Sequence, residues 1–181
     1  MEKFKFKYRE YDFKNDSVIV QNWLDRTAVK NLGFDDYNEQ IRNKSRSKIF
    51  DETKALMVTL NGHSVASVFL TTKNNVATIY DIIVDNQLRG NGVGKNVIKD
   101  VALNINNFGF KNSITSIDAG IKLTNEASLY AFVDAGFKFK KNRDNYLVKI
   151  DDLQKYNELN KNKNQKLEKI LENNSEDTLN Y

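Results

Sequence analysis

The chain has 181 residues, 40% of them hydrophobic and 29% charged, which suits one domain with its own core. Its formal net charge of +4 only slightly favours anionic ligands. The absence of cysteine excludes disulfides, thiolate metal sites and a cysteine nucleophile, and the single histidine gives little basis for a zinc site, so we expect no metal. Acidic residues along the whole chain argue against nucleic acid as a partner, and without a membrane-length apolar run or a secretory h-region we expect a cytoplasmic protein that does not contact a membrane.

The first part of the chain predicts a strand, two helices and a β-hairpin. Aromatic and basic residues alternate over 4–9, as in a strand with one solvated face. A helix is expected from 16 to about 28, and a second helix with a weaker pattern over 36–49. Strands are expected over 55–60 and 64–70, because an Asn-Gly pair between them is typical of a tight hairpin turn.

A strand that leads through a glycine-rich turn into a helix follows at 76–94. Val76 to Val84 is rich in β-branched and apolar residues. Three glycines then alternate with other residues from 89 to 94, and apolar residues recur at helical spacing after them. The first amides of a helix lack intrahelical partners and carry partial positive charge, and glycine lets a phosphate approach them. With Arg89 and Lys95 adding charge, this segment predicts a cradle for a phosphate or pyrophosphate.

The glycine pattern fits only one of three known phosphate-binding motifs. It fails G-x-x-x-x-G-K-[ST] because Asn96 follows Lys95, and it fails G-x-G-x-x-G because Lys95 stands at the third glycine. It fits [QR]-x-x-G-x-[GA] in two overlapping registers, which begin at Gln87 and Arg89. This pattern resembles the acetyl-coenzyme A signature of the GCN5-related N-acetyltransferases, the GNAT family. The alternative is a glycine-rich connector that binds no ligand.

A second match to the family lies in a predicted helix that begins at Thr124 or Asn125. The family carries N-x-x-A-x-x-x-Y-x-x-x-G-F here, and Asn125, Gly136 and Phe137 match it. Phe132 stands where the family usually has tyrosine. A strand over 113–119 precedes this helix and a hairpin over 137–150 follows it. Together the two motifs and the order of elements extend the resemblance over roughly residues 4–150.

The resemblance implies an α/β fold of the α+β type. Its central sheet is mixed and mostly antiparallel, with six to seven strands and helices on both faces, in the order β-α-α-β-β-β-α-β-α-β-β. Residues 1–150 form the GNAT domain in this interpretation. The polar segment 151–181 is either a marginal amphipathic helix that packs on a partner, for example in a homodimer, or a disordered tail.

The resemblance also implies where acetyl-coenzyme A binds. Two parallel strands, at about 76–85 and 113–119, splay apart and hold the pantetheine arm, while the pyrophosphate rests on amides of the glycine segment. A primary amine on a small-molecule or protein acceptor then attacks the thioester directly. The implied cofactor-binding residues are Ile82, Ile83, Val84, Arg89, Gly90, Asn91, Gly92, Val93, Gly94, Lys95, Asn125 and Phe132.

Direct attack needs a base, because an alkyl ammonium has a pKa of about 10.4. Asp81 is the candidate, since it is a carboxylate inside an otherwise apolar strand; a structural hydrogen bond is the alternative reason for its presence. Asp118 is a second candidate on the other splayed strand. Tyr80 points to the opposite face unless the strand has a bulge. His63 follows the hairpin turn and is expected to be a turn residue rather than catalytic.

The proton for the departing thiolate has no obvious donor. The family usually supplies it from the helix tyrosine, and Phe132 has no hydroxyl. Tyr130 lies about 200° from position 132 around the helix, so it is expected to be a packing or surface tyrosine rather than the acid. Either the thiolate leaves unassisted or through water, or the protein is a catalytically weak or inactive acetyl-coenzyme A-binding module with a regulatory or interaction role.

Acceptor specificity is expected to come from the segment between the first strand and the hairpin. Tyr37, Arg42 and the loop 50–54 are candidates there. Nothing in this segment identifies the acceptor, since fold-level resemblance indicates a reaction type and not a substrate.

Overall fold

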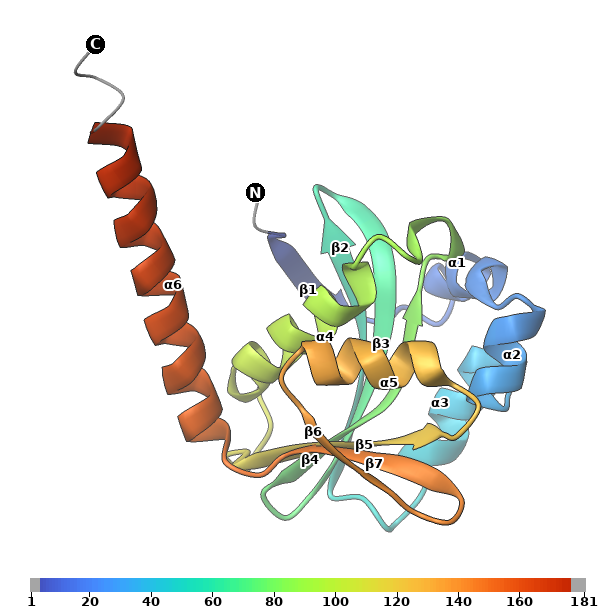
Figure 1. The fold of residues 1–181 in the computed structure, drawn as a ribbon. Coiled ribbons are helices and arrows are strands. Elements are labelled where there is room, and N and C mark those ends of the chain that lie inside the picture. Colours follow the sequence, from blue (N-terminus) through green and yellow to red (C-terminus); the bar gives the residue numbers. More distant parts are fainter. Residues whose placement is uncertain (1–3, 177–181) are drawn as a thin grey trace.

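The protein is described by a computed structural model over residues 4–176, and a mixed sheet of seven strands forms the centre of this part of the chain (Figure 1). The strand order is β1-β2-β3-β4-β5-β7-β6. Neighbouring strands are antiparallel except for β4 and β5, which are parallel. The strands are β1 (Phe6–Glu10), β2 (Glu52–Leu60), β3 (His63–Lys73), β4 (Val76–Val84), β5 (Ser116–Lys122), β6 (Lys138–Lys141) and β7 (Asn145–Ile150). The predicted mixed, mostly antiparallel sheet is therefore confirmed.

Helices cover both faces of this sheet. One core cluster contains the buried residues of α4 and α5, and a second contains those of α1 and α3, with β-strand residues in each. The helices are α1 (Asp16–Trp23), α2 (Arg26–Leu32), α3 (Tyr37–Ser45), α4 (Val93–Asn104), α5 (Glu126–Asp134) and α6 (Leu153–Glu176), with short 3₁₀ turns η1 (Asn86–Leu88) and η2 (Ile105–Asn107). This two-sided arrangement fits the nearly continuous burial along β3 and the apolar stripes of the helices.

The predicted helix from 16 to 28 is wrong in one respect, because the segment forms two helices. The Asp25 carboxylate accepts a hydrogen bond from the Ala28 amide and so begins α2. The Arg89 guanidinium donates to the Trp23 carbonyl oxygen and, at 2.6 Å, to Asp25. Arg89, which holds the break between α1 and α2, lies 64 residues after Asp25 in the chain. A pattern confined to residues 16–28 cannot indicate this contact. The next helix is also shorter than predicted and ends at Ser45.

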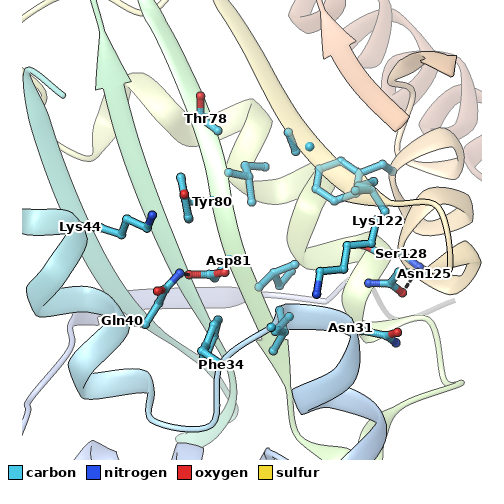
Figure 2. Close-up of a pocket in the computed structure, with 18 residues that line it drawn as sticks. Asn31, Phe34, Gln40, Lys44, Thr78, Tyr80, Asp81, Lys122, Asn125 and Ser128 are labelled. Atoms are coloured by element: carbon cyan, nitrogen blue, oxygen red, sulfur yellow. Dashed lines mark hydrogen bonds between the residues drawn. The ribbon is translucent and has the colours of Figure 1, made fainter. Parts of the chain in front are cut away.

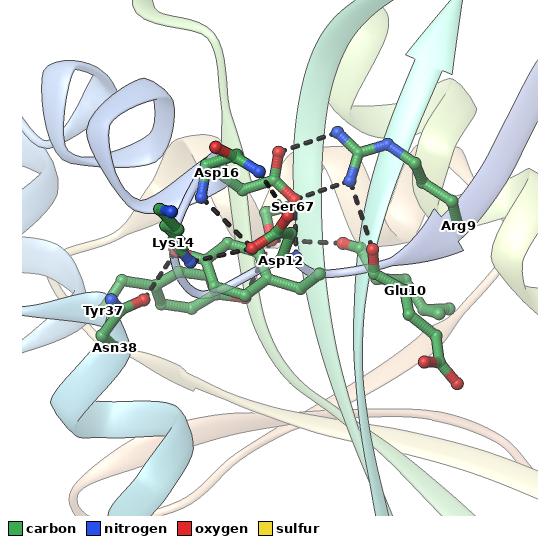
Figure 3. Close-up of polar contacts among 11 residues, drawn as sticks. Arg9, Glu10, Asp12, Lys14, Asp16, Tyr37, Asn38 and Ser67 are labelled. Atoms are coloured by element: carbon green, nitrogen blue, oxygen red, sulfur yellow. Dashed lines mark hydrogen bonds and ion pairs between the residues drawn. The ribbon is translucent and has the colours of Figure 1, made fainter.

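A buried carboxylate joins β1 to α1 (Figure 3). Asp16, the first residue of α1, accepts two hydrogen bonds from the Arg9 guanidinium, at 2.6 and 2.7 Å, and one from the Asp12 amide at 2.7 Å. A bidentate guanidinium pair of this kind satisfies a carboxylate that has lost its water. The network therefore fixes the start of α1 against the sheet.

A β-bulge in β4 changes which face its side chains point to. Phe69 of β3 pairs with Asp81, but the next residue of β3 pairs with Ile79, so Tyr80 is the extra residue. Ile79 belongs to the core cluster under α4 and α5, whereas Ile83, four residues later, belongs to the cluster under α1 and α3. In a regular strand these two side chains would share a face. The bulge therefore places Tyr80 and Asp81 on the same side of the sheet.

The last helix, α6, leaves the domain after two turns (Figure 1). Leu153 and Tyr156 are 2% and 8% exposed and belong to the main core cluster. The Tyr156 hydroxyl donates to the Ala135 carbonyl oxygen at 2.6 Å. Beyond these contacts the apolar side chains of α6 are exposed: Leu159, Leu167, Ile170 and Leu171. Of the two alternatives for the polar segment after residue 150, the structure has the helix, as far as Glu176.

Candidate functional site

The parallel strands β4 and β5 pair briefly and then diverge. Residues 76–78 pair with 116–118, and the Thr78 hydroxyl donates to the Asp118 carboxylate at 2.5 Å. The strands continue to Val84 and Lys122 without further pairing to each other. The β5-facing edge of β4 therefore has no strand partner after Thr78. The splayed pair that the resemblance implied is present, although β5 begins at Ser116 rather than at 113.

Two cavities meet at this splay. The Asp81 cavity has a volume of about 480 Å³ and lies between β4, β5, α3 and the α2–α3 connection. The glycine-loop cavity has a volume of about 550 Å³ and extends from the splay to the segment 89–95. Both are lined by the same five residues where they meet: Asn31, Leu32, Ile82, Asn125 and Ser128. A long, thin ligand can therefore lie in one cavity and present its end to the other.

The glycine-loop cavity is bounded largely by the residues that the resemblance assigned to the cofactor. Its lining includes Ile82, Ile83, Val84, Arg89, Gly90, Gly92, Gly94, Lys95 and Asn125. Gly92 is the N-cap of α4 with φ +76°, and no side chain caps the amides of the first turn. Gly90 also has a positive φ, and a Cβ added there would meet no atom within 4 Å. The N-terminus of α4 is therefore open to an anion.

Three of the assigned residues are not on the wall of the glycine-loop cavity. Asn91 does not line it, and Val93 is buried in the main core cluster under α4. Phe132 lines the Asp81 cavity instead. These three residues can support the loop or the splay, but in this structure their side chains do not bound the space in which a pyrophosphate would lie.

The guanidinium of Arg89, which also lines the glycine-loop cavity, is already paired within the protein. It pairs with Asp25 at 2.6 Å and also donates to the carbonyl oxygens of Trp23 and Val84. The pKa of Asp25 is lowered, chiefly by the hydrogen bond from the Ala28 amide and further by Arg89. Arg89 therefore ties the loop to the α1–α2 break.

Lys95 is the remaining cation on the wall of the glycine-loop cavity. Within residues 4–176 it has no ion-pair partner. The positive charge of the cradle therefore comes from Lys95 and from the N-terminal amides of α4.

Asp81 lies in the wall of the other cavity with a side chain that is almost fully buried (Figure 2). It is 6% exposed, and within the described residues its one hydrogen bond is a long contact of 3.4 Å from Gln40 Nε2. Burial raises the pKa of Asp81 to about 6, while Gln40 and the charge of Lys44 oppose this shift. At neutral pH the group is therefore ionised, poorly satisfied and able to accept a proton.

The other catalytic candidates lie elsewhere. Asp118 is not on the wall of the Asp81 cavity and accepts from Thr78. His63 is exposed at the start of β3. Tyr130 is 62% exposed and lines the glycine-loop cavity, away from Asp81. Phe132, at the position of the usual tyrosine, does line the Asp81 cavity; it is 2% exposed, with its ring edge-on to a neighbouring phenylalanine at 5.0 Å.

The residues expected to face the acceptor are also placed differently. Tyr37 is buried in the core, and its hydroxyl accepts from Ser67 at 3.1 Å. The Arg42 guanidinium lies over the Phe13 ring, 5.2 Å from its centroid. Neither of them, nor the loop 50–54, lines the Asp81 cavity.

The sequence did not single out several side chains that line the Asp81 cavity. They are Phe34, Gln40, Lys44, Lys122 and Ser128. Gln40 and Lys44 are four residues apart on α3, which is the spacing of one helix face. That spacing was the one available signal, because Lys122 comes from the end of β5 and no motif links it to α3.

Among residues 4–176 no three histidine, aspartate or glutamate side chains are grouped so that they could hold a metal ion. The same part of the chain contains no helix with the length and hydropathy needed to cross a bilayer.

The sequence matches no protein-family model and no curated protein, but its structure is similar to solved ones. The GNAT domain of PAT from S. lividans superposes with a TM-score of 0.62 at 15% identity, over 80% of this chain and 88% of that one. An aminoglycoside acetyltransferase in complex with coenzyme A gives 0.62 at 16% identity, over 80% and 92%. A chimera of the Vibrio cholerae spermidine N-acetyltransferase gives 0.63 at 15% identity, over 83% and 97%. The strand order, the splayed parallel pair and these superpositions agree, and the chain has the fold of the GCN5-related N-acetyltransferases.

Proposed function

We propose that the protein is an acyltransferase that moves the acetyl group of acetyl-coenzyme A to a primary amine. The observation that carries this proposal is the junction of the two cavities at the splay. An anion cradle bounds one cavity, and a buried carboxylate bounds the other. Solved structures with the same fold include acetyltransferases bound to coenzyme A, which supports the same cosubstrate here.

The residues present fit such a cosubstrate. Gly90, Gly92 and the first amides of α4 suit the pyrophosphate, and Lys95 adds positive charge. The free edge of β4 around Ile82 offers backbone groups to the amides of the pantetheine arm. The Val84 carbonyl oxygen already accepts from Arg89 Nε, so the contacts of the arm are expected to centre on Ile82 and Ile83.

The chemistry follows from the position of Asp81. Its carboxylate takes a proton from the acceptor ammonium, directly or through water, so that the amine nitrogen can attack the thioester carbonyl carbon. The new C–N bond forms, the C–S bond breaks and coenzyme A leaves as a thiolate, while the nitrogen loses its second proton to water and becomes a neutral amide. Phe132 offers no proton at this point, so the thiolate takes one from solvent. A thiol with a pKa of about 8.5 is a tolerable leaving group.

Calorimetric titration with acetyl-coenzyme A, coenzyme A and ATP tests the proposed cosubstrate. We expect micromolar binding of both coenzyme A species and much weaker binding of ATP, because only the former can fill the splay as well as the cradle. If none of the three compounds binds, the glycine segment is only a connector between β4 and α4, and the proposed function is wrong.

A second function is favoured by one observation, the phenyl ring of Phe132 where a hydroxyl is usual. A binding module would retain coenzyme A affinity without turnover. Thiol release against a broad panel of amines separates the two functions. A measurable rate with any amine excludes the binding module, and tight cofactor binding with no rate favours it.

A further inference from the structure

The Asp81 cavity carries more positive than negative charge. Its charged lining residues are Asp81, Lys44 and Lys122, and among residues 4–176 no other carboxylate lines it. Figure 2 shows the two lysines reaching in from opposite sides of Asp81. They come from α3 and from the end of β5, so the fold brings them together from elements far apart in the sequence.

Neither ammonium group is neutralised within residues 4–176. Lys44 Nζ lies 5.0 Å from the centroid of the Tyr80 ring and forms no ion pair. Lys122 Nζ donates to the Lys30 carbonyl oxygen at 3.1 Å and likewise has no acidic partner. Both lysines therefore keep their charge available to a ligand.

This charge pattern disfavours polycationic acceptors. An ammonium brought next to Lys44 or Lys122 meets a like charge, which opposes binding and excludes wrong partners. One amine can lie at Asp81, but a second and third cannot be paired on this wall. Spermidine and aminoglycosides, which give their names to two enzymes of the same fold, carry several amines.

We infer that the acceptor is an amine that also carries an anionic group, a carboxylate or a phosphate. This inference rests on the proposed function and names the substrate class of the same site. The amine lies at Asp81, and the anion pairs with Lys44 or Lys122. The apolar walls of the cavity, which include Phe34 and Ile121, accommodate the remainder of a small molecule.

Matched acceptors test the inference. L-leucine and 3-methylbutylamine differ by one carboxylate, and phosphoethanolamine and ethanolamine differ by one phosphate. We expect kcat/KM, measured as thiol release from acetyl-coenzyme A, to be at least about tenfold higher for the anionic member of one pair, a difference of about 1.4 kcal/mol. The pair with the larger ratio identifies carboxylate or phosphate as the anion. Spermidine and kanamycin are expected to be the poorest acceptors.

Lysine variants connect the preference to the cavity. Lys44→Gln and Lys122→Gln are each expected to lower kcat/KM for the anionic acceptor about fivefold, because a charge-assisted pair is lost. With Lys122→Gln the rate with the uncharged-tail acceptor is expected to change by less than about twofold, since that acceptor makes no such pair. Lys44→Gln also removes a charge that lowers the pKa of Asp81, so its effect is judged by the ratio of kcat/KM between the two members of each pair, which a change in the base alone leaves unaltered. Lys138→Gln, on the exposed strand β6, is the matched control that removes a charge far from the cavity.

The results distinguish this inference from the proposed function. Absence of coenzyme A binding in calorimetry refutes the proposed function. Coenzyme A binding together with equal turnover of both members of each pair, or with faster turnover of spermidine, overturns the inference alone. If no amine is turned over, ligand-observed NMR with the coenzyme A complex decides: preferential binding of the anionic members, lost in the lysine variants, supports the inference, and its absence overturns it.

Discussion

Asp81, the proposed base, lowers the stability of the folded protein when its buried carboxylate is ionised. Its pKa in the folded protein is raised to about 6 from an ordinary value of 3.8, because burial disfavours the charged form. The folded state therefore binds the proton more tightly than the unfolded state. The stability that this gives is fully present below about pH 4 and is lost as the pH rises through about 6.

Asp81→Asn is accordingly expected to stabilise the protein at pH 8 and to leave its stability unchanged at pH 3. The gain at pH 8 is on the order of 2 kcal/mol, since asparagine keeps an acceptor for Gln40 without a buried charge. Urea unfolding at the two pH values measures it. A variant less stable than the wild type at pH 8 would show that the carboxylate has a structural role.

The same substitution is expected to abolish most of the activity. Removing a general base typically lowers the rate by about 10²-fold or more, so kcat/KM should fall by at least that factor. In the wild type, kcat/KM is expected to rise with pH through about 6 as Asp81 loses its proton. The pH–rate profiles of both proteins check this, and a profile of Asp81→Asn that retains the rise near pH 6 would assign the base to another group.

Phe132→Tyr tests whether the missing hydroxyl limits turnover. The ring is fully enclosed and lines the Asp81 cavity, so the added hydroxyl lies at the site. If solvent already protonates the thiolate, kcat changes by less than about tenfold, or about 1.4 kcal/mol of barrier. A larger gain would show that proton delivery is rate-limiting. Unchanged thermal stability and coenzyme A affinity confirm that the variant is properly folded.

At the scale of elements, the turn between β4 and α4 holds the proposed anion site and also a backbone conformation that strains any residue other than glycine. Gly92 has φ +76°, and Gly109, outside the cavity, has φ +77° with open space around it. Alanine at either position adopts an unfavourable conformation, with a cost of about 1–2 kcal/mol. We expect only Gly92→Ala to weaken coenzyme A binding, by about tenfold, because only there does a methyl group stand at the cradle. Equal affinities of the two variants in calorimetry would contradict this assignment.

Elements with a local signal were predictable from the sequence. The Asn61-Gly62 turn has positive φ at both residues, as its composition predicts, and β4 spans 76–84 as expected. The break after Trp23 was not predictable, because the Arg89 side chain that holds it lies far along the chain. The bulge at Tyr80 depends on the register with β3, which no pattern within β4 encodes.

The candidate site divides in the same way. The glycines and Asn125 belong to contiguous motifs, so the sequence alone groups residues that line the glycine-loop cavity. Asp81 was noticed because a carboxylate is unusual in an apolar strand. Lys44 and Lys122 are ordinary polar residues of a helix and a strand, and they acquire a shared role only when the sheet brings these elements together.

For the whole molecule, α6 is part of the domain only at its start. A chain that ends at Asp152 loses Leu153 and Tyr156 from the core and is expected to be destabilised by about 3 kcal/mol or more, whereas a chain that ends at Gln165 keeps both. Urea midpoints of the two chains and the full protein check this. A chain ending at Gln165 that is as unstable as the shorter one would show that the outer turns also support the fold.

The longer truncation also permits a test of self-association. It removes Leu167, Ile170 and Leu171, which are exposed on α6, without touching the buried contacts. The homodimer stays a prediction, and sedimentation of the chain that ends at Gln165 tests it. Because this chain keeps the buried contacts of α6, a change in its oligomeric state cannot be attributed to unfolding. A chain ending at Asp152 would confuse the two effects.

The bulge in β4 has a consequence for how this chain can diverge. Replacing the side chain of Tyr80 leaves the number of residues between Ile79 and Asp81 unchanged, so the later side chains keep their faces. Deleting Tyr80 alone restores simple alternation and still leaves Ile79 and Ile83 on opposite faces, because the residues on either side of the bulge keep their partners in β3. Removing a residue between Asp81 and Ile83 instead turns Ile83 out of its core cluster. We therefore expect a length change within β4 to be tolerated only at the bulge, and other length changes to accumulate in the connection between α3 and β2.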